Sequence, residues 1–153
     1  MTSTSSVKWA KGRGKLGFLR PLFGVWKATA DSPTGTVTCV RTFEPVLRGR
    51  YVRLSAIWNM RAGVYEELAL YGVRGDGQIG FWSFASDGGH SEGVRSDASD
   101  IHSEAISFES RMPAGLARMA YWPDDRQGLH WVVEARTKHG WKRFTHHHYV
   151  AGR

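Results

Sequence analysis

The sequence predicts an all-β protein, and three observations carry that prediction. Short runs rich in β-branched and aromatic residues follow one another after Pro21, several with apolar and polar residues in alternation. Turn-forming stretches separate these runs, and the chain has 18 glycines against only 5 prolines. No run has the length and pattern of the crossover helices that connect parallel strands. About nine short strands at this spacing are typical of an antiparallel barrel or sandwich.

The elements can be placed in order along the chain. Residues 9–22 could form a short helical lead-in, which the glycines there weaken. The clearest alternation lies in 51–60, where apolar residues occupy every second position from Val52. The stretch "SDGGHSEG" at 86–93 is interpreted as a glycine-rich connection. The expected strands are 24–30, 35–45, 49–60, 64–73, 78–86, 103–112, 115–122, 128–136 and 141–150.

Length and charge set the domain organisation that we expect. With 153 residues the chain can bury one core, so we predict a single barrel domain over 16–153 after a flexible basic segment at 1–15. The net charge of +7 comes from the two ends, because residues 21–134 hold 11 basic and 14 acidic residues. A basic end could attract nucleic acid or anionic lipid. No aromatic groove with interleaved basic residues accompanies it, so a nucleic-acid partner ranks last.

Cysteine content and hydropathy point to a reducing compartment. Cys39 is the only cysteine and cannot form a disulfide within the chain. No apolar run is long enough for a membrane span or a signal sequence. We therefore expect a cytoplasmic protein. Two stretches, "GRGKLG" and "GDGQIG", fit the dinucleotide pattern G-x-G-x-x-G, but neither lies between a strand and a helix as that mechanism requires.

The order of the motifs resembles the calycin superfamily. A helical lead-in "LGFLRPL" precedes a G-x-W motif at Gly24 and Trp26, and the stretches "FEPVLRGRYV", "YEELALYGV" and "GFWSFASDGG" come after it. Over 16–150 the chain is similar to bacterial lipocalin-like domains of unknown function and, more distantly, to haem-binding nitrobindins. The resemblance implies an antiparallel up-and-down barrel of about 8–10 strands, which holds one small ligand or fills with side chains. It also implies that Trp26 packs under the closed end.

The leading functional hypothesis is that the barrel binds an apolar or amphipathic small molecule in its interior. Alternating positions place large side chains on one face of each strand, where they could form a cavity wall or an ordinary core. A homodimer through the barrel edges stays an open alternative. The candidate ligand-binding residues are Trp58, Met60, Trp82, Phe84, Trp131, Phe144, His146 and His148.

The run "RFTHHHYV" provides the alternative hypothesis of a haem protein. Imidazole ligates iron, and neighbouring side chains on a strand face opposite ways, so His146 and His148 share a face with Phe144. Phe144 suggests that this face points inward. The nitrobindin resemblance implies an axial haem ligand on the last strand, for which His146 is the best match and His148 the second. A small enzyme on the same barrel, with His90 in a loop at the mouth, is a further alternative.

Overall fold

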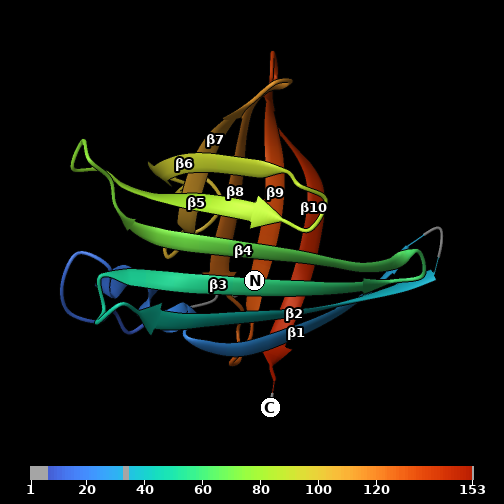
Figure 1. The fold of residues 1–153 in the computed structure, drawn as a ribbon, viewed down its shortest axis with the longest axis horizontal. Helices are drawn as coiled ribbons and strands as arrows, with labels where there is room; N and C mark the ends of the chain where they lie inside the picture. Colours follow the sequence, from blue (N-terminus) through green and yellow to red (C-terminus); the bar gives the residue numbers. More distant parts are fainter. Residues whose placement is uncertain (1–6, 33–34, 153) are drawn as a thin grey trace, which may run out of the picture.

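The computed structural model describes residues 7–32 and 35–152, which form a closed antiparallel barrel (Figure 1). Each strand pairs with the next in the sequence, and the last strand pairs with the first. The predicted all-β meander barrel with a short N-terminal helix is confirmed. The elements are η1 (Gly17–Leu22), β1 (Gly24–Ser32), β2 (Gly35–Val46), β3 (Tyr51–Met60), β4 (Gly63–Val73), β5 (Ile79–Ala85), β6 (His90–Ser96), β7 (Ile106–Met112), β8 (Gly115–Pro123), β9 (Leu129–Thr137) and β10 (Gly140–Ala151).

Strand β6 occupies the stretch that the sequence indicates as a connection. Its residues have weak strand propensity, but β5 and β7 provide partners on both sides. Gly93 is needed there, because a Cβ at this position would lie 2.2 Å from the Glu109 carbonyl oxygen. Tertiary pairing therefore makes a strand where local propensity favours a loop.

The 3-10 helix η1 and the start of β1 close one end of the barrel. Gly24 turns the chain with φ 119°, a conformation that other residues rarely adopt. Trp26 lies two residues after Gly24 and is buried. Its Nε1 donates a hydrogen bond to the Leu22 carbonyl oxygen at 2.7 Å. Phe18, Leu19 and Leu22 of η1 join the same core cluster. The G-x-W motif thus packs the closed end of the barrel.

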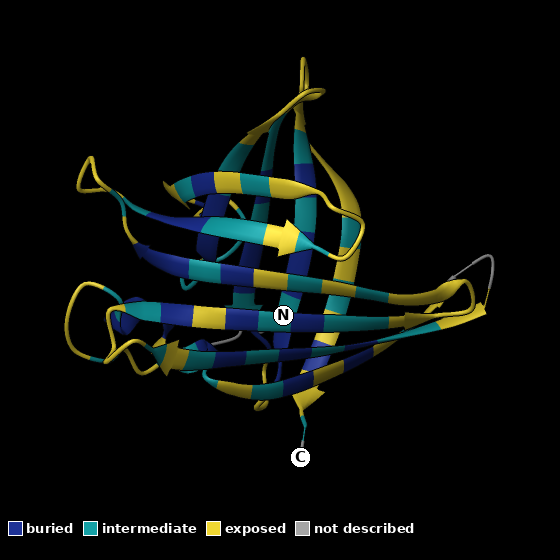
Figure 2. Ribbon diagram, viewed as in Figure 1, coloured by how far each residue is buried: buried dark blue, intermediate teal, exposed yellow. Residues whose placement is uncertain are grey.

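Buried and more exposed residues alternate along many of the strands (Figure 2). In β3 the inward residues Val52, Leu54 and Ala56 are buried, as the alternation in the sequence predicts. Part of the outer face is covered as well, because Ala98 in the connection between β6 and β7 packs against Ala120 of β8 and Val132 of β9. The core therefore lies inside the barrel, with a smaller cluster outside β8 and β9.

The barrel is joined least extensively between its first and last strands. The β1–β2 ladder runs from Gly24 opposite Phe43 to Ser32 opposite Gly35. The β1–β10 ladder consists of Trp26 opposite Ala151 and Lys27 opposite Val150. Over the described residues beyond Lys27 the two strands are no longer paired, so the barrel has a seam in the half farther from η1.

The segment before η1 is only partly described. Residues 1–6 of the basic segment lie outside the described residues, and Trp9 packs half-buried against the core cluster. The Trp9 backbone N–H donates to Glu104 Oε1 at 2.9 Å. Across 7–32 and 35–152, no helix combines the length and apolar character needed to span a membrane.

Candidate functional site

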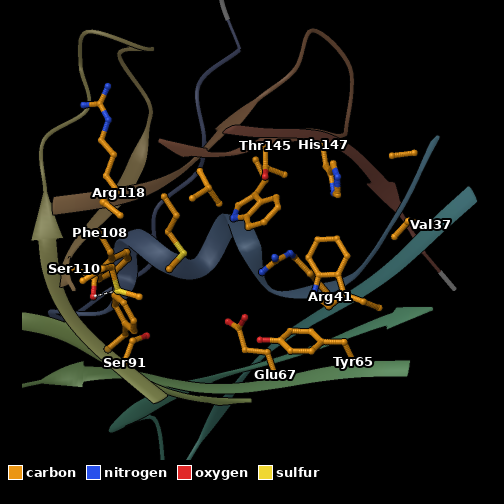
Figure 3. Close-up of a pocket in the computed structure, with 18 of the residues that line it drawn as sticks. Val37, Arg41, Tyr65, Glu67, Ser91, Phe108, Ser110, Arg118, Thr145 and His147 are labelled. Atoms are coloured by element: carbon orange, nitrogen blue, oxygen red, sulfur yellow. Dashed lines mark hydrogen bonds between the residues drawn. The ribbon is translucent and has the colours of Figure 1, made fainter. Parts of the chain in front are cut away.

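The half of the barrel away from η1 contains a cavity of about 530 Å³ (Figure 3). Met60 at the end of β3 and Met112 at the end of β7 are partly exposed residues of its lining, so the cavity opens where these strands end. A volume of this size matches that of ordinary small-molecule sites. The wall is mainly apolar and includes Val37, Trp58, Phe81, Phe108, Met119 and Trp131.

Arg41 is the main charged group inside the barrel. It is 2% exposed, and it shares the inward face of β2 with Cys39 and Phe43. Its Nε donates to the Tyr149 hydroxyl at 2.9 Å, and Nη1 donates to the Tyr121 hydroxyl at 3.0 Å. Among the described residues no carboxylate forms an ion pair with it. A guanidinium has five N–H donors, so these two bonds leave donors for another group.

Aromatic rings surround the guanidinium and provide part of its stabilisation. The Arg41 Cζ lies 4.1 Å from the centroid of the Trp131 ring and 5.5 Å from that of Trp58. A desolvated contact between a cation and an aromatic face contributes about 2 kcal/mol. Arg41 is therefore held in the cavity wall by two hydroxyls and by π faces.

Two buried polar atoms of cavity-lining residues have no hydrogen-bond partner in the described structure: Trp131 Nε1 and His147 Nδ1. The ring of His147 lies 5.2 Å from that of Trp58 and 5.5 Å from that of Trp131. Burial lowers the pKa of His147, and the positive charge of Arg41 lowers it further. A neutral imidazole and an indole N–H without partners, beside a buried cation, are groups that a polar ligand atom could satisfy.

Tyr121 and Glu67 complete the polar side of the interior. Burial raises the pKa of Tyr121 to about 12, although the nearby Arg41 lowers it. The phenol is therefore neutral at physiological pH and can accept a hydrogen bond from Arg41. Glu67 on β4 is half-buried and points toward the cavity opposite Arg41 and His147 (Figure 3).

Three of the candidate residues from the sequence line the cavity, namely Trp58, Met60 and Trp131. Trp82 and Phe84 do not, and their expected inward orientation is wrong. On β5 it is Phe81 that is buried and lines the cavity, whereas Phe84 is 56% exposed. Trp82 packs against the ring of Tyr51, with centroids 6.3 Å apart. Both faces of β5 contain aromatic residues, so their spacing alone could not identify the inner face.

The expected inward face of β10 is also wrong. Thr145 and His147 line the cavity, whereas Phe144 is 64% exposed and His146 and His148 are on the outer face. A β-bulge is the cause. The register steps from Arg143 opposite Glu134 to Thr145 opposite Val133, which inserts one extra residue and exchanges the two faces of the strand after it.

Haem ligation inside the barrel by His146 or His148 does not fit this orientation. The His146 Nε2 instead lies 3.0 Å from Nδ1 of His130, and His148 Nε2 lies 2.6 Å from Asp124 Oδ2, both outside the cavity. His90, the candidate of the enzyme hypothesis, is exposed and lines a depression of about 200 Å³ with Asp87. This depression adjoins the cavity, because Tyr65, Glu67, Ser91 and Met112 line both. The histidine that lines the cavity is His147.

The residues that sequence reasoning missed are Arg41, His147 and Glu67. For Arg41 a signal was present, because Cys39 and Phe43 lie two residues away on either side and mark its face as inward. For His147 a signal was also present, because Tyr149 lies two residues away on the same face. Phe144 marks the opposite face by the same rule, and the bulge before Thr145 decides between them. Glu66 and Glu67 are neighbours on a strand and point apart, and that same alternation directs one of the two inward.

No protein-family model matches this chain, and a search of curated proteins finds no match either. The closed antiparallel barrel with its short N-terminal helix is consistent with a calycin-like or lipocalin-like fold. A barrel of this kind, with a partly apolar cavity and a buried arginine in its wall, could hold a ligand.

Proposed function

We propose that the barrel binds an amphipathic small molecule, with the apolar part in the cavity and an anionic or strongly accepting group at Arg41. The observation that carries the proposal is a fully buried arginine that has no carboxylate partner among the described residues, set in an apolar cavity of about 530 Å³. Burial of a charge is costly unless it is paired. A ligand carboxylate would provide that pairing.

The polar end of such a ligand would find several donors together. Arg41 retains free N–H groups, and Trp131 Nε1–H has no acceptor in the described structure. The Trp131 ring and the guanidinium are in contact, so one oxygen-bearing group could accept from both. Hydrogen bonds that involve a charged partner contribute about 1.5–3 kcal/mol each.

The apolar end would lie along the aromatic and aliphatic wall toward the mouth. Each buried methylene group contributes about 0.8 kcal/mol, which is roughly a fourfold gain in affinity. Met60 and Met112 at the rim are flexible side chains that can adapt to chains of different length. Affinity should therefore rise with chain length until the cavity is filled.

Calorimetric titration with a saturated carboxylic acid and the alcohol of equal chain length tests the proposal. We expect the acid to bind more tightly, and Arg41→Met to reduce its affinity by about 10–100-fold while the alcohol is little affected. Arg53→Met is the matched control, because Arg53 lies on the exposed face of β3, where it pairs with Glu44.

The stability of Arg41→Met distinguishes a ligand anchor from a structural residue. Arg41→Met removes a buried charge that has no carboxylate partner, which favours folding, but it also removes the donor to the Tyr121 and Tyr149 hydroxyls and the contact with the Trp131 ring, which opposes folding. Because these contributions are of similar size, we expect the free energy of unfolding in urea to differ from that of the wild type by no more than about 2 kcal/mol. Equal binding of the acid by wild type and by folded Arg41→Met would contradict the proposal, as would the absence of binding for both ligands.

A further inference from the structure

The histidine run of β10 contributes to a second cluster, on the outer face of the barrel. His146 and His148 both point outward after the bulge, and His130 of β9 lies directly opposite His148 in the ladder. We call His130, His146 and His148 the outer histidine patch. Strands β9 and β10 lie side by side (Figure 1) and are paired from Gly140 to Tyr149 of β10. Three imidazoles from two adjacent strands therefore occupy one surface.

The distances within the patch are short. His130 Nδ1 lies 3.0 Å from His146 Nε2. The ring centroid of His130 is 5.1 Å from that of His146 and 5.0 Å from that of His148. His130 thus lies between the other two rings. Its own orientation is supported by Trp122, which stacks on it at 5.1 Å with an interplanar angle of 22°.

Asp124 holds the third ring. His148 Nε2 lies 2.6 Å from Asp124 Oδ2, and the same carboxylate accepts the backbone N–H groups of Arg126 and Gly128. A carboxylate at Nε2 keeps a proton there and leaves Nδ1 of the neutral ring with a lone pair. Histidine ligands of metal ions commonly have such a carboxylate on the nitrogen that does not bind the metal.

The geometry points to a binding site for a divalent transition-metal ion, formed by the outer histidine patch with Asp124 as the supporting carboxylate. Imidazole is a preferred ligand of Zn²⁺, Cu²⁺ and Ni²⁺. The site is separate from the interior cavity, because the three rings are on the opposite side of the strands from His147.

The spacing of the nitrogens fits an ion of this kind. Two nitrogens at about 2.0–2.1 Å from a tetrahedral Zn²⁺ lie roughly 3.3 Å apart. The nitrogens of His130 and His146 need to separate by only a few tenths of an ångström from the distance found here. Ring centroids in such a site are about 5 Å apart, as estimated from the same bond length, and both centroid distances of His130 agree with this.

Binding of the ion would bring in His148 as the third ligand. No group of three or more His, Cys, Asp or Glu side chains in 7–32 and 35–152 is preassembled as a metal site. His130 and His146 provide a preformed pair, whereas the half-exposed His148 would have to rotate about its contact with Asp124 to bring Nδ1 toward them. Water would occupy the fourth position, as it does in zinc sites with three protein ligands.

Proton and charge balance allow the ion to bind. In the hydrogen bond between His130 and His146 one ring donates, and metal binding moves that proton to the other nitrogen of the same ring. Arg143, whose charge acts on His130 and His146, donates to Glu134 Oε2 at 2.9 Å. Asp124 adds a negative charge beside His148. The surroundings therefore do not repel a divalent cation strongly.

Calorimetric titration of the full chain with ZnCl₂ tests this inference. We expect saturable binding of one ion, weakened by more than 100-fold in His130→Gln and in His146→Gln. Asp124→Asn retains an acceptor oxygen for the turn and should weaken binding by about 10–100-fold. His139→Gln is the matched control, because His139 lies in the exposed turn between β9 and β10.

The Zn²⁺ titration tests the outer histidine patch independently of the ligand titration that tests the cavity. Folding of each variant is checked by near-ultraviolet circular dichroism, and the exposure of His146 makes unfolding of His146→Gln unexpected. A wild-type protein that binds no Zn²⁺ stoichiometrically would overturn the inference, as would equal affinities of wild type and the two glutamine variants. Arg41→Met should leave Zn²⁺ binding unchanged, since its side chain is in the interior.

Discussion

Arg41 and the two tyrosines around it determine the chemistry of the barrel interior. Tyr121 and Tyr149 are almost completely buried, and each hydroxyl accepts from the same guanidinium. Their phenols are neutral at physiological pH because burial raises the pKa of both. Each is therefore an uncharged acceptor, so the positive charge of Arg41 remains available to a ligand.

At the scale of the residue, Tyr121 predicts that the free energy of unfolding of the protein decreases at alkaline pH. Tyr121 keeps its proton in the folded state up to about pH 12, whereas the unfolded phenol loses it near pH 10. Deprotonation then favours the unfolded state, so the stability present below pH 10 is lost as the pH rises to 12. Urea unfolding should show a decrease of roughly 2 kcal/mol from this residue.

Tyr121→Phe identifies the contribution of this one phenol. The variant should show a shallower decrease in unfolding free energy between pH 10 and 12, because it has no Tyr121 proton to lose. Tyr51→Phe is the control, since Tyr51 is half-buried and packs against Trp82 on the outer face. Identical pH profiles for wild type and Tyr121→Phe would contradict the assignment.

At the scale of the element, β1 begins with a conformational requirement at Gly24. The positive φ of 119° lets η1 pass directly into β1, so that Trp26 can return a hydrogen bond to Leu22. A Cβ at Gly24 would meet nothing within 4 Å. The requirement is therefore for the backbone conformation and not for space.

Gly24→Ala should destabilise the barrel by about 1–3 kcal/mol through backbone strain alone. Gly75→Ala is a closely matched control, because a Cβ there also meets nothing within 4 Å and its φ lies outside the positive region. We expect Gly75→Ala to be neutral or to stabilise by up to about 1 kcal/mol. Equal effects of the two substitutions in thermal unfolding would show that the conformation of Gly24 is not the cause.

At the scale of the whole molecule, closure of the barrel depends on the shortest ladder. The seam between β1 and β10 borders the cavity, because Ala30 and His147 line it from the two strands. Strands that are not paired expose backbone groups and open more easily than the strands of a continuous ladder. The seam is therefore the part of the barrel wall where the cavity is least enclosed by hydrogen bonds.

Hydrogen exchange should reveal this seam. Amides in 28–31 that do not point toward β2 should exchange at least tenfold faster than those of Leu54 and Ala56 in the centre of β3, which is paired on both sides. Mass spectrometry with electron-transfer fragmentation gives the needed residue resolution. Equal protection in the two regions would mean that the β1–β10 ladder extends beyond Lys27.

Much of the fold can be predicted from local patterns. Alternation in β3 predicts which residues are buried. The resemblance to the calycin superfamily implies the end that Trp26 packs against. The candidate site was predicted less well, because each strand has two faces and one extra residue exchanges them. In β10 that residue is Phe144, whose bulge directs His147 inward and His146 outward.

The sequence by itself determined an antiparallel all-β chain and most of its turn positions, since these depend on residue propensity and short-range periodicity. The tryptophan-closed end was expected from the resemblance to the calycin superfamily. Only the tertiary structure decided which aromatic residues line the cavity, that Arg41 lies buried between two tyrosines, and that His130 meets His146 and His148 outside. The physical reason is register. Pairing between strands distant in sequence, including the bulge in β10 and the closure of β1 on β10, assigns each side chain to one face, and no local pattern contains that information.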